Sequence, residues 1–181
     1  MQKFIFPAAL AALLCLHCGT AAAKPKPELK GDVVMILVPV TGISVAYFTD
    51  DSLGEKEWLR TMAGGVVAHA LAAVAFNYTS WGKRPGGGQH GFPSGHMTFV
   101  TSGASFLQDR YGWKWGVPGY LGAAYVGWVR VDTLHHRWRD VIGGAVLAVG
   151  VSKLFVTPEN ASHLAPVIGP DWLGLRWERS F

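Results

Sequence analysis

Five apolar stretches, separated by short polar or glycine-rich connections, constrain the fold of this chain more than any other feature. They cover residues 33–48, 62–78, 97–107, 116–129 and 141–156. None shows the regular alternation of apolar and polar residues that is typical of a strand, and their content of alanine, glycine, leucine and valine favours helices. We therefore expect an all-α fold, a helical bundle with about five apolar helices.

The composition favours a bundle that is embedded in a membrane. Of the 181 residues, 50% are hydrophobic and 15% are charged, and the mean hydropathy is +0.23. Each stretch is shorter than the roughly 20 residues that span a bilayer upright, but the first, second and fifth become plausible spans with their flanks. The third contains several hydroxyl residues and is expected inside the bundle. A soluble helical domain that buries the same stretches is the alternative.

The N-terminus has the pattern of a secretory signal peptide over residues 1–23. Lys3 precedes an apolar run over 4–16, and three alanines at 21–23 form a small-residue cleavage site, so the mature chain is expected to begin near Lys24. Both cysteines, Cys15 and Cys18, lie in this segment, which excludes disulfides and a cysteine nucleophile from the mature chain. An uncleaved anchor helix is the alternative.

The rest of the chain divides into three parts. Residues 24–32 are expected to be a proline-containing N-terminal spacer, 33–158 the helical domain, and 159–181 a C-terminal tail. In the tail, residues 172–177 alternate weakly and fit a short strand or an interfacial segment. The net charge of +4 comes from scattered basic residues, which does not indicate a partner of nucleic acid.

Three clusters of polar residues beside the apolar stretches carry the candidate chemistry. They are Lys83 and Arg84 before a run of glycines, Ser94, Gly95 and His96 at the start of the third stretch, and Arg130, His136 and Asp140 before the fifth. Arg84 and Arg130 present planar donors that match phosphate oxygens in bidentate geometry. Ser94 and Gly95 lie where a helix begins, and its unpaired N–H groups favour an anion. These clusters predict a phosphate site.

The histidines of these clusters suggest covalent chemistry at that phosphate. His136 and Asp140 are four residues apart, which places both on one face of a helix. A carboxylate that bonds one ring nitrogen leaves the other free to attack phosphorus. His96 can then protonate the leaving oxygen and afterwards deprotonate a water molecule. Because the arginines stabilise the developing charge, this scheme calls for no metal and no cofactor.

The same residues resemble the ordered motifs of the superfamily of type 2 phosphatidic-acid phosphatases and vanadium haloperoxidases, and in particular its membrane-associated lipid phosphatase branch. Those motifs read K-x6-R-P, P-S-G-H and S-R-x5-H-x3-D. Here the second is complete at 93–96, the third is present as Arg130-x5-His136-x3-Asp140, and the first as Arg84-Pro85. The spacing selects His136 over the adjacent His135, which is out of register by one residue.

Two positions depart from the pattern. Asn77 stands where the first motif has lysine, and Val129 stands where the third has serine. The neighbouring Lys83 is a candidate replacement for the missing lysine and is included among the expected phosphate ligands, with Arg84, Arg130, Ser94 and Gly95. Weaker phosphate binding or a narrower range of substrates is expected from these departures.

The resemblance implies a phosphatase that hydrolyses a lipid phosphate monoester or diphosphate through a phosphohistidine. His136 would be the nucleophile, His96 the general acid and base, and Asp140 the residue that orients His136. The expected location is the inner membrane, with the site facing the periplasm. The alternatives are a soluble periplasmic acid phosphatase of broad range, a vanadate-dependent haloperoxidase, a phosphotransferase that uses an alcohol acceptor, and a non-catalytic protein that binds lipid phosphates.

Overall fold

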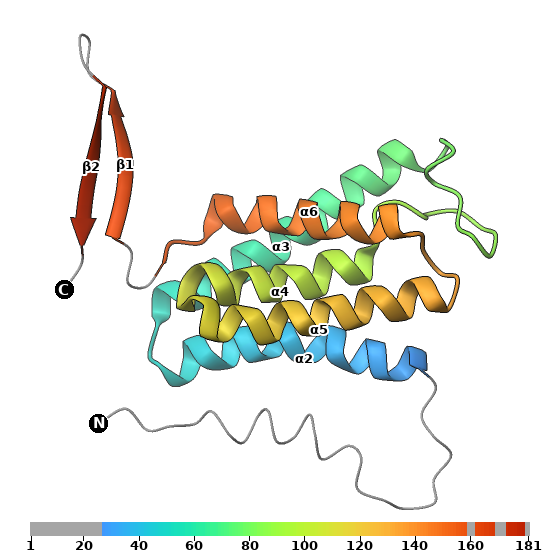
Figure 1. Cartoon of the computed structure of the whole chain (residues 1–181), viewed down its shortest axis with the longest axis horizontal. Helices are drawn as coiled ribbons and strands as arrows, with labels where there is room; N and C mark the ends of the chain where they lie inside the picture. The colour runs from blue at the N-terminus through green and yellow to red at the C-terminus, as the bar shows by residue number, and fades with distance from the viewer. Residues whose placement is uncertain (1–26, 159–161, 169–172, 180–181) are drawn as a thin grey trace, which may run out of the picture.

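A computed structural model describes residues 27–158, 162–168 and 173–179 (Figure 1). Within them, five helices are followed by a β-hairpin, which confirms the predicted helical bundle. The helices are α2 (Pro27–Phe48), α3 (Ser52–Phe76), α4 (Gly95–Tyr111), α5 (Trp113–Asp132) and α6 (Trp138–Phe155). The strands β1 (Ser162–Ile168) and β2 (Leu173–Arg179) pair antiparallel, so the strand alternative is correct for residues 173–177 of the tail. The predicted signal peptide, 1–23, lies outside the described residues.

The first helix begins earlier than the sequence predicted. Residues 27–32 were expected in the spacer, but they form the first turns of α2, which starts at Pro27. Proline is tolerated in the first turn of a helix because its missing N–H would have no helical acceptor there. Glu28 in the same turn interacts favourably with the positive end of the helix dipole. The correction places Asp32 on a helix.

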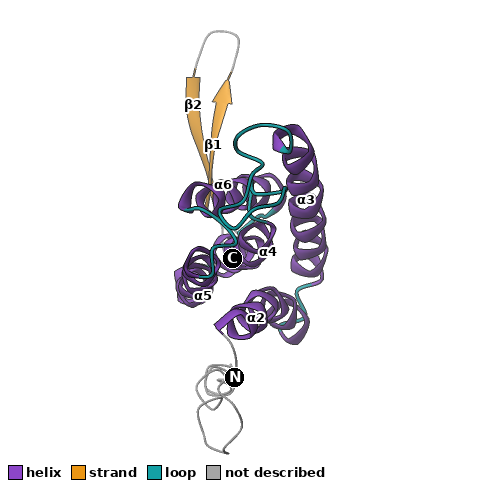
Figure 2. Cartoon of the chain, turned by 90° about the vertical axis from the view of Figure 1, so that its right-hand side faces the viewer, coloured by secondary structure: helices purple, strands orange, loops and turns teal. Residues whose placement is uncertain are grey.

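The helix α4 is the centre of the bundle and packs against each of the other four helices (Figure 2). Two of its hydroxyl groups are satisfied locally, since Thr98 Oγ1 donates to the Ser94 carbonyl at 3.1 Å and Ser102 Oγ to the Thr98 carbonyl at 2.8 Å. Thr101 Oγ1 is buried without a partner among the described residues. A Cβ atom at Gly103 would lie 2.6 Å from the Cα of Pro39, so only glycine permits this approach of α2 to α4. The prediction that the third stretch lies inside the bundle is confirmed.

The outer faces of α2 and α3 are apolar and uncovered. Both helices are long and apolar enough to cross a membrane, yet only 28% and 22% of their apolar windows are buried inside the bundle. Leu71 is 68% exposed and Val74 is 72% exposed. Such faces are unfavourable in water and favourable against lipid. The fifth stretch was also expected to be able to span a membrane. The helix that it forms, α6, is less suited to a span than α2 and α3, because its 18 residues include three charged side chains, Arg139, Asp140 and Lys153.

A buried ionic cluster ties together the end of the bundle where α2 meets α3. The Arg110 guanidinium donates to both carboxylate oxygens of Asp51, at 2.7 and 2.8 Å, and to the Thr157 carbonyl at 2.6 Å. The Tyr111 hydroxyl donates to Asp51 at 2.9 Å. The hydrogen bonds from Arg110 hold the pKa of Asp51 below its usual range. This cluster joins the α2–α3 turn, the end of α4 and the segment after α6.

Candidate active site

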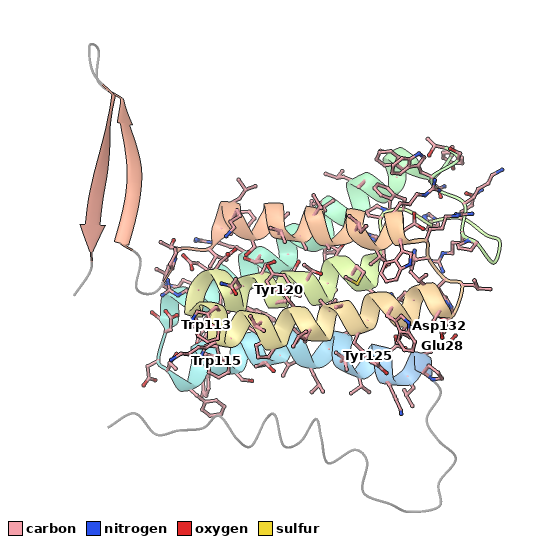
Figure 3. All side chains as sticks on the ribbon, viewed as in Figure 1. Glu28, Trp113, Trp115, Tyr120, Tyr125 and Asp132 are labelled. Atoms are coloured by element: carbon pink, nitrogen blue, oxygen red, sulfur yellow. The ribbon has the colours of Figure 1, made fainter. Side chains whose placement is uncertain are left out.

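The predicted site residues all lie at the opposite end of the bundle from this ionic cluster. The connection from α3 to α4 carries Lys83 and Arg84, the first turn of α4 carries Gly95 and His96, and the connection from α5 to α6 carries His136. All three segments emerge at one end (Figure 1). Figure 3 labels Glu28 and Asp132 at this end, and Trp113 and Trp115 at the other. The up-and-down order of the helices therefore assembles residues that are far apart in the sequence.

The start of α4 forms one wall of the site. Ser94 is the N-cap, but its side chain makes no capping hydrogen bond, and its Oγ is buried without a partner among the described residues. Its backbone N–H donates to the Asp140 carbonyl at 2.9 Å. A Cβ atom at Gly144 would lie 2.5 Å from the Ser94 carbonyl oxygen, so glycine lets α6 approach α4 here. The buried hydroxyl and the positive end of a 17-residue helix together favour an anion.

Arg130 supplies a second donor group from the end of α5. Its side chain is 7% exposed, and its Nη2 donates to the carboxylate of Asp32 on α2. Its Nε is buried and has no partner within the described part of the chain. A buried donor without an acceptor costs roughly 1–3 kcal/mol, and an oxyanion at this position would remove that cost.

Arg84 and Lys83 lie in the connection between α3 and α4, and they differ in what they contribute. Arg84 donates from Nε to the His90 carbonyl at 3.4 Å, and its positive charge lies near enough to His136 to lower the pKa of that imidazole. Lys83 has an exposed side chain, and its backbone carbonyl accepts from Arg137. The phosphate role of the Lys83 ammonium group stays a prediction.

The same connection is held by residues that the sequence did not assign to this task. Asn77, which replaces the motif lysine, accepts from the His90 N–H at 3.3 Å. The Arg139 guanidinium lies 4.9 Å from the centre of the Trp81 ring and donates to the Ser80 carbonyl at 3.1 Å. Arg137 and Arg139 flank His136 in the sequence and are candidates for attracting an anionic substrate. In the structure both side chains also bind the connection between α3 and α4.

His136 is held in one tautomer by a backbone carbonyl. Its ring is 4% exposed, and Nδ1 lies 2.8 Å from the Gly91 carbonyl oxygen. Because a carbonyl oxygen can only accept, Nδ1 carries the proton and Nε2 keeps a free lone pair. The pKa of His136 is lowered to about 4, chiefly by burial and also by the charges of Arg84 and His96, against the opposing effects of the Gly91 hydrogen bond and the Asp140 carboxylate. The imidazole is therefore neutral at pH 7.

Asp140 does not form the hydrogen bond to His136 that the sequence predicted. The nearest Asp140 oxygen is 3.9 Å from His136 Nδ1, and it accepts instead from the Arg137 N–H at 2.8 Å. The other oxygen lies 3.3 Å from Arg139 Nε. The physical reason is local: Asp140 is three residues after the N-cap of α6, where a carboxylate satisfies a free backbone N–H of the first turn. Its influence on His136 is electrostatic at this distance.

The neutral state of His136 gives a pH prediction. The folded pKa of about 4 lies below the unfolded value of about 6.5, so the unfolded chain binds more protons between these values. The stability of the fold is thus expected to fall as the pH is lowered from 6.5 to 4, and to be independent of this group above 6.5. Imidazole NMR in detergent, with His136→Gln to assign the signal, should give a titration near pH 4. A titration near 6.5 would show that the ring is exposed.

Two residues near the site were missed or misjudged from the sequence. Asp32 contacts both Arg130 and His96, with 3.4 Å between its carboxylate and His96 Nε2. The only available signal was its position as a charge at the edge of the first apolar stretch. His69 lies in the middle of an apolar stretch and outside every motif, which predicts a satisfied core histidine. In the structure its Nδ1 is buried without a partner among the described residues, and its ring lies against Gly95.

The structure brings together the two arginines, the start of α4 and a buried, oriented histidine at one end of a helical bundle. The lipid A 4'-phosphatase of Helicobacter pylori (strain J99) is similar to this chain: it is 29% identical over 153 residues, which cover 80% of this chain and 77% of the relative. Lipid phosphate phosphatase 2 of Arabidopsis thaliana is 34% identical over 79 residues, and the match covers 36% of this chain and 27% of the relative. No family model and no solved structure matches the chain. The two relatives confirm the resemblance to the type 2 phosphatidic-acid phosphatase superfamily.

Proposed function

We propose that this protein hydrolyses a phosphate monoester or diphosphate on a lipid, with His136 as the covalent phosphate acceptor. The observation that carries the proposal is the state of His136: a buried, neutral imidazole whose Nδ1–H is bonded to Gly91, so that Nε2 is unprotonated. The buried and unpartnered Ser94 Oγ and Arg130 Nε support a bound phosphate beside it. The names of both relatives, which are phosphatases of lipids, support the substrate class.

The chemistry follows in two balanced steps. The lone pair of His136 Nε2 forms a bond to phosphorus, while the bond from phosphorus to the leaving oxygen breaks and His96 gives that oxygen a proton. His96 then takes a proton from water, whose oxygen bonds phosphorus as the bond to Nε2 breaks. Inorganic phosphate leaves, and both histidines return to their first states. Arg84 and Arg130 stabilise the charge on the phosphoryl oxygens in both steps, which is why no metal is included.

The carboxylate of Asp140 is proposed to act on the first step at a distance. Attack on phosphorus places a positive charge on the His136 ring, because Nδ1 keeps its proton. The Asp140 carboxylate is fully buried and 3.9 Å away, so it stabilises that charge in surroundings of low polarity. Orientation of the ring, the role expected for Asp140 from the sequence, is assigned here to the Gly91 carbonyl.

We place the bundle in the inner membrane with the site facing the periplasm. The uncovered apolar faces of α2 and α3 support contact with lipid, and the exposed Trp113 at the far end of the bundle is typical of a membrane interface. The helix α2 begins at the same end as the site. If the segment before it is exported, as the signal-like residues 1–23 suggest, the site lies on the exported side.

The experiment is phosphate release by the purified protein in detergent, with a chelator present. The substrates are phosphatidic acid, phosphatidylglycerol phosphate, a polyprenyl diphosphate, lipid A and a water-soluble aryl phosphate. Release from at least one lipid in the presence of chelator is the expected result. Release from the soluble ester alone would replace the lipid phosphatase by a broad-range acid phosphatase. Release that needs an added divalent ion would overturn the mechanism, and binding of lipid phosphate without release would indicate a binding protein.

A further inference from the structure

Asp32 brings a negative charge into a site that is otherwise built for anions. It lies on α2, outside every motif, and 98 positions before Arg130 in the sequence. One of its oxygens, Oδ1, accepts from Arg130 Nη2 and lies 3.4 Å from His96 Nε2. A single carboxylate oxygen thus joins a predicted phosphate ligand on α5 to the predicted general acid on α4.

Asp32 has a different effect on each of its two partners, Arg130 and His96. The Arg130 side chain is 7% exposed, and a buried guanidinium requires a counter-charge, while Asp32 itself is 43% exposed and loses little hydration. Since Asp32 uses Nη2, the buried Nε of Arg130 stays available to a phosphate oxygen. For His96, a carboxylate within about 4 Å favours the protonated ring, which is the form that can protonate a leaving oxygen.

We propose that Asp32 is a positioning residue of the active site, which holds Arg130 and His96 before the substrate binds and favours the protonated form of His96. The proposal rests on the proposed function for its catalytic consequence, but not for its effect on phosphate binding. Asp32 also opposes the incoming phosphate, because both are negative. Asp32 therefore favours the chemical step and weakens the binding of phosphate. Its replacement by a neutral residue should slow the chemical step and tighten phosphate binding.

Among the charged and titratable groups around His96, Asp32 is the one that stabilises the protonated ring. The groups that face it or its first turn come from four parts of the chain: Asp32 from α2, His69 from α3, Arg130 from α5, and His135 and His136 from the connection after α5. Burial of the ring and the charge of Arg130 hold the pKa of His96 below its usual value, and His135 acts in the same direction. Of these neighbours, only the Asp32 carboxylate favours the protonated ring. Removing Asp32 leaves no described neighbour that stabilises the imidazolium.

The matched control is Glu28→Gln, which removes the same charge one turn earlier on α2. Glu28 lies 3.9 Å from His135 Nδ1 rather than beside His96, and it is labelled at the site end of the bundle in Figure 3. Both variants keep the shape of the side chain, and both replaced carboxylates are partly exposed, so the helix is expected to remain folded. Any difference between the two variants is then due to the position of the lost charge and not to the change in net charge.

Asp32→Asn is expected to lower the titration midpoint of His96 by about one pH unit, measured by imidazole NMR of the full chain in detergent. It is also expected to tighten the binding of inorganic phosphate by about three- to tenfold, because one repulsive charge is removed. In turnover, KM and kcat should both fall, and the basic limb of the kcat profile should move to lower pH. Glu28→Gln should leave each of these quantities within about twofold or 0.3 pH unit, because an exposed charge that does not contact His96 or Arg130 acts weakly on them.

Weaker phosphate binding in Asp32→Asn with an unchanged His96 titration would overturn the proposal, because it would reduce Asp32 to a structural partner of Arg130. Equal behaviour of the two variants would overturn it as well. If the wild type releases phosphate from no substrate, the proposed function fails, but the NMR titration and phosphate binding still decide the role of Asp32.

Discussion

His136→Ala is expected to reduce phosphate release by about three orders of magnitude or more, with the residual rate set by substrate binding alone. The reason is that no neighbouring group can replace a neutral imidazole whose free nitrogen is unprotonated. His135 is the nearest candidate, but its Nδ1 lies 2.9 Å from Thr133 Oγ1 and 3.9 Å from Glu28, so its ring is engaged elsewhere. The measurement is kcat with the lipid that the wild type prefers.

His135→Ala is the matched control for this prediction. It removes an imidazole from the adjacent position, and its kcat is expected to stay within about fivefold of the wild type, as for a residue without contact to the reacting atoms. With substrate labelled in the phosphoryl group, rapid quenching in alkali should trap label on the wild type and on His135→Ala, but not on His136→Ala. Equal losses in both variants, or label that persists without His136, would contradict the assignment of the nucleophile.

The sequence was informative where function depends on residues that are close together in the chain. The interval from Arg130 to His136 distinguished the buried His136 from the adjacent His135, and the helix start at Gly95 was readable from the preceding proline and serine. Local spacing fixes the direction of side chains on a helix, so such predictions need no knowledge of the tertiary fold.

The partners of these residues were not predictable in the same way. Gly91 holds His136 through a backbone carbonyl 45 positions away, and a carbonyl group is present at every residue, so no side-chain signal marks it. Asp140 was expected to bond His136 because of its spacing, but the free N–H groups at the start of α6 are stronger and nearer competitors for its oxygens. Asp32 reaches the site only through the packing of α2 against α4 and α5.

The boundaries of the helices show the same limit. The run of apolar residues predicted that the second helix begins at Met62, whereas α3 begins at Ser52. Its first turns carry Glu55 and Glu57, which an apolar pattern excludes, and Asp51 caps the helix by accepting from the Gly54 N–H at 2.9 Å. Glu57 is 2% exposed and lies 3.6 Å from Arg110, so a charge in this helix is buried because a residue of α4 neutralises it. Burial of a charged residue of this kind depends on its partner in the fold and cannot be predicted from hydropathy.

Arg130→Lys tests whether the donors of the site act by geometry or by charge alone, and it is expected to lower kcat/KM by about 100- to 1,000-fold. Lysine keeps the positive charge and the attraction to Asp32, but it lacks the planar group that donates to Asp32 and to phosphate from different edges.

Arg139→Lys is the matched control, because Arg139 lies over Trp81 and bonds the Ser80 carbonyl. We expect Arg139→Lys to stay within about tenfold of the wild type, since lysine keeps a positive charge beside Asp140 and the other lost contacts hold the loop. Thermal unfolding in detergent separates lost function from lost fold: Arg130→Lys should unfold within a few degrees of the wild type while binding inorganic phosphate more weakly. If Arg130→Lys were as active as the wild type, a point charge would suffice at this position, and the buried Nε would have no part in holding the phosphate.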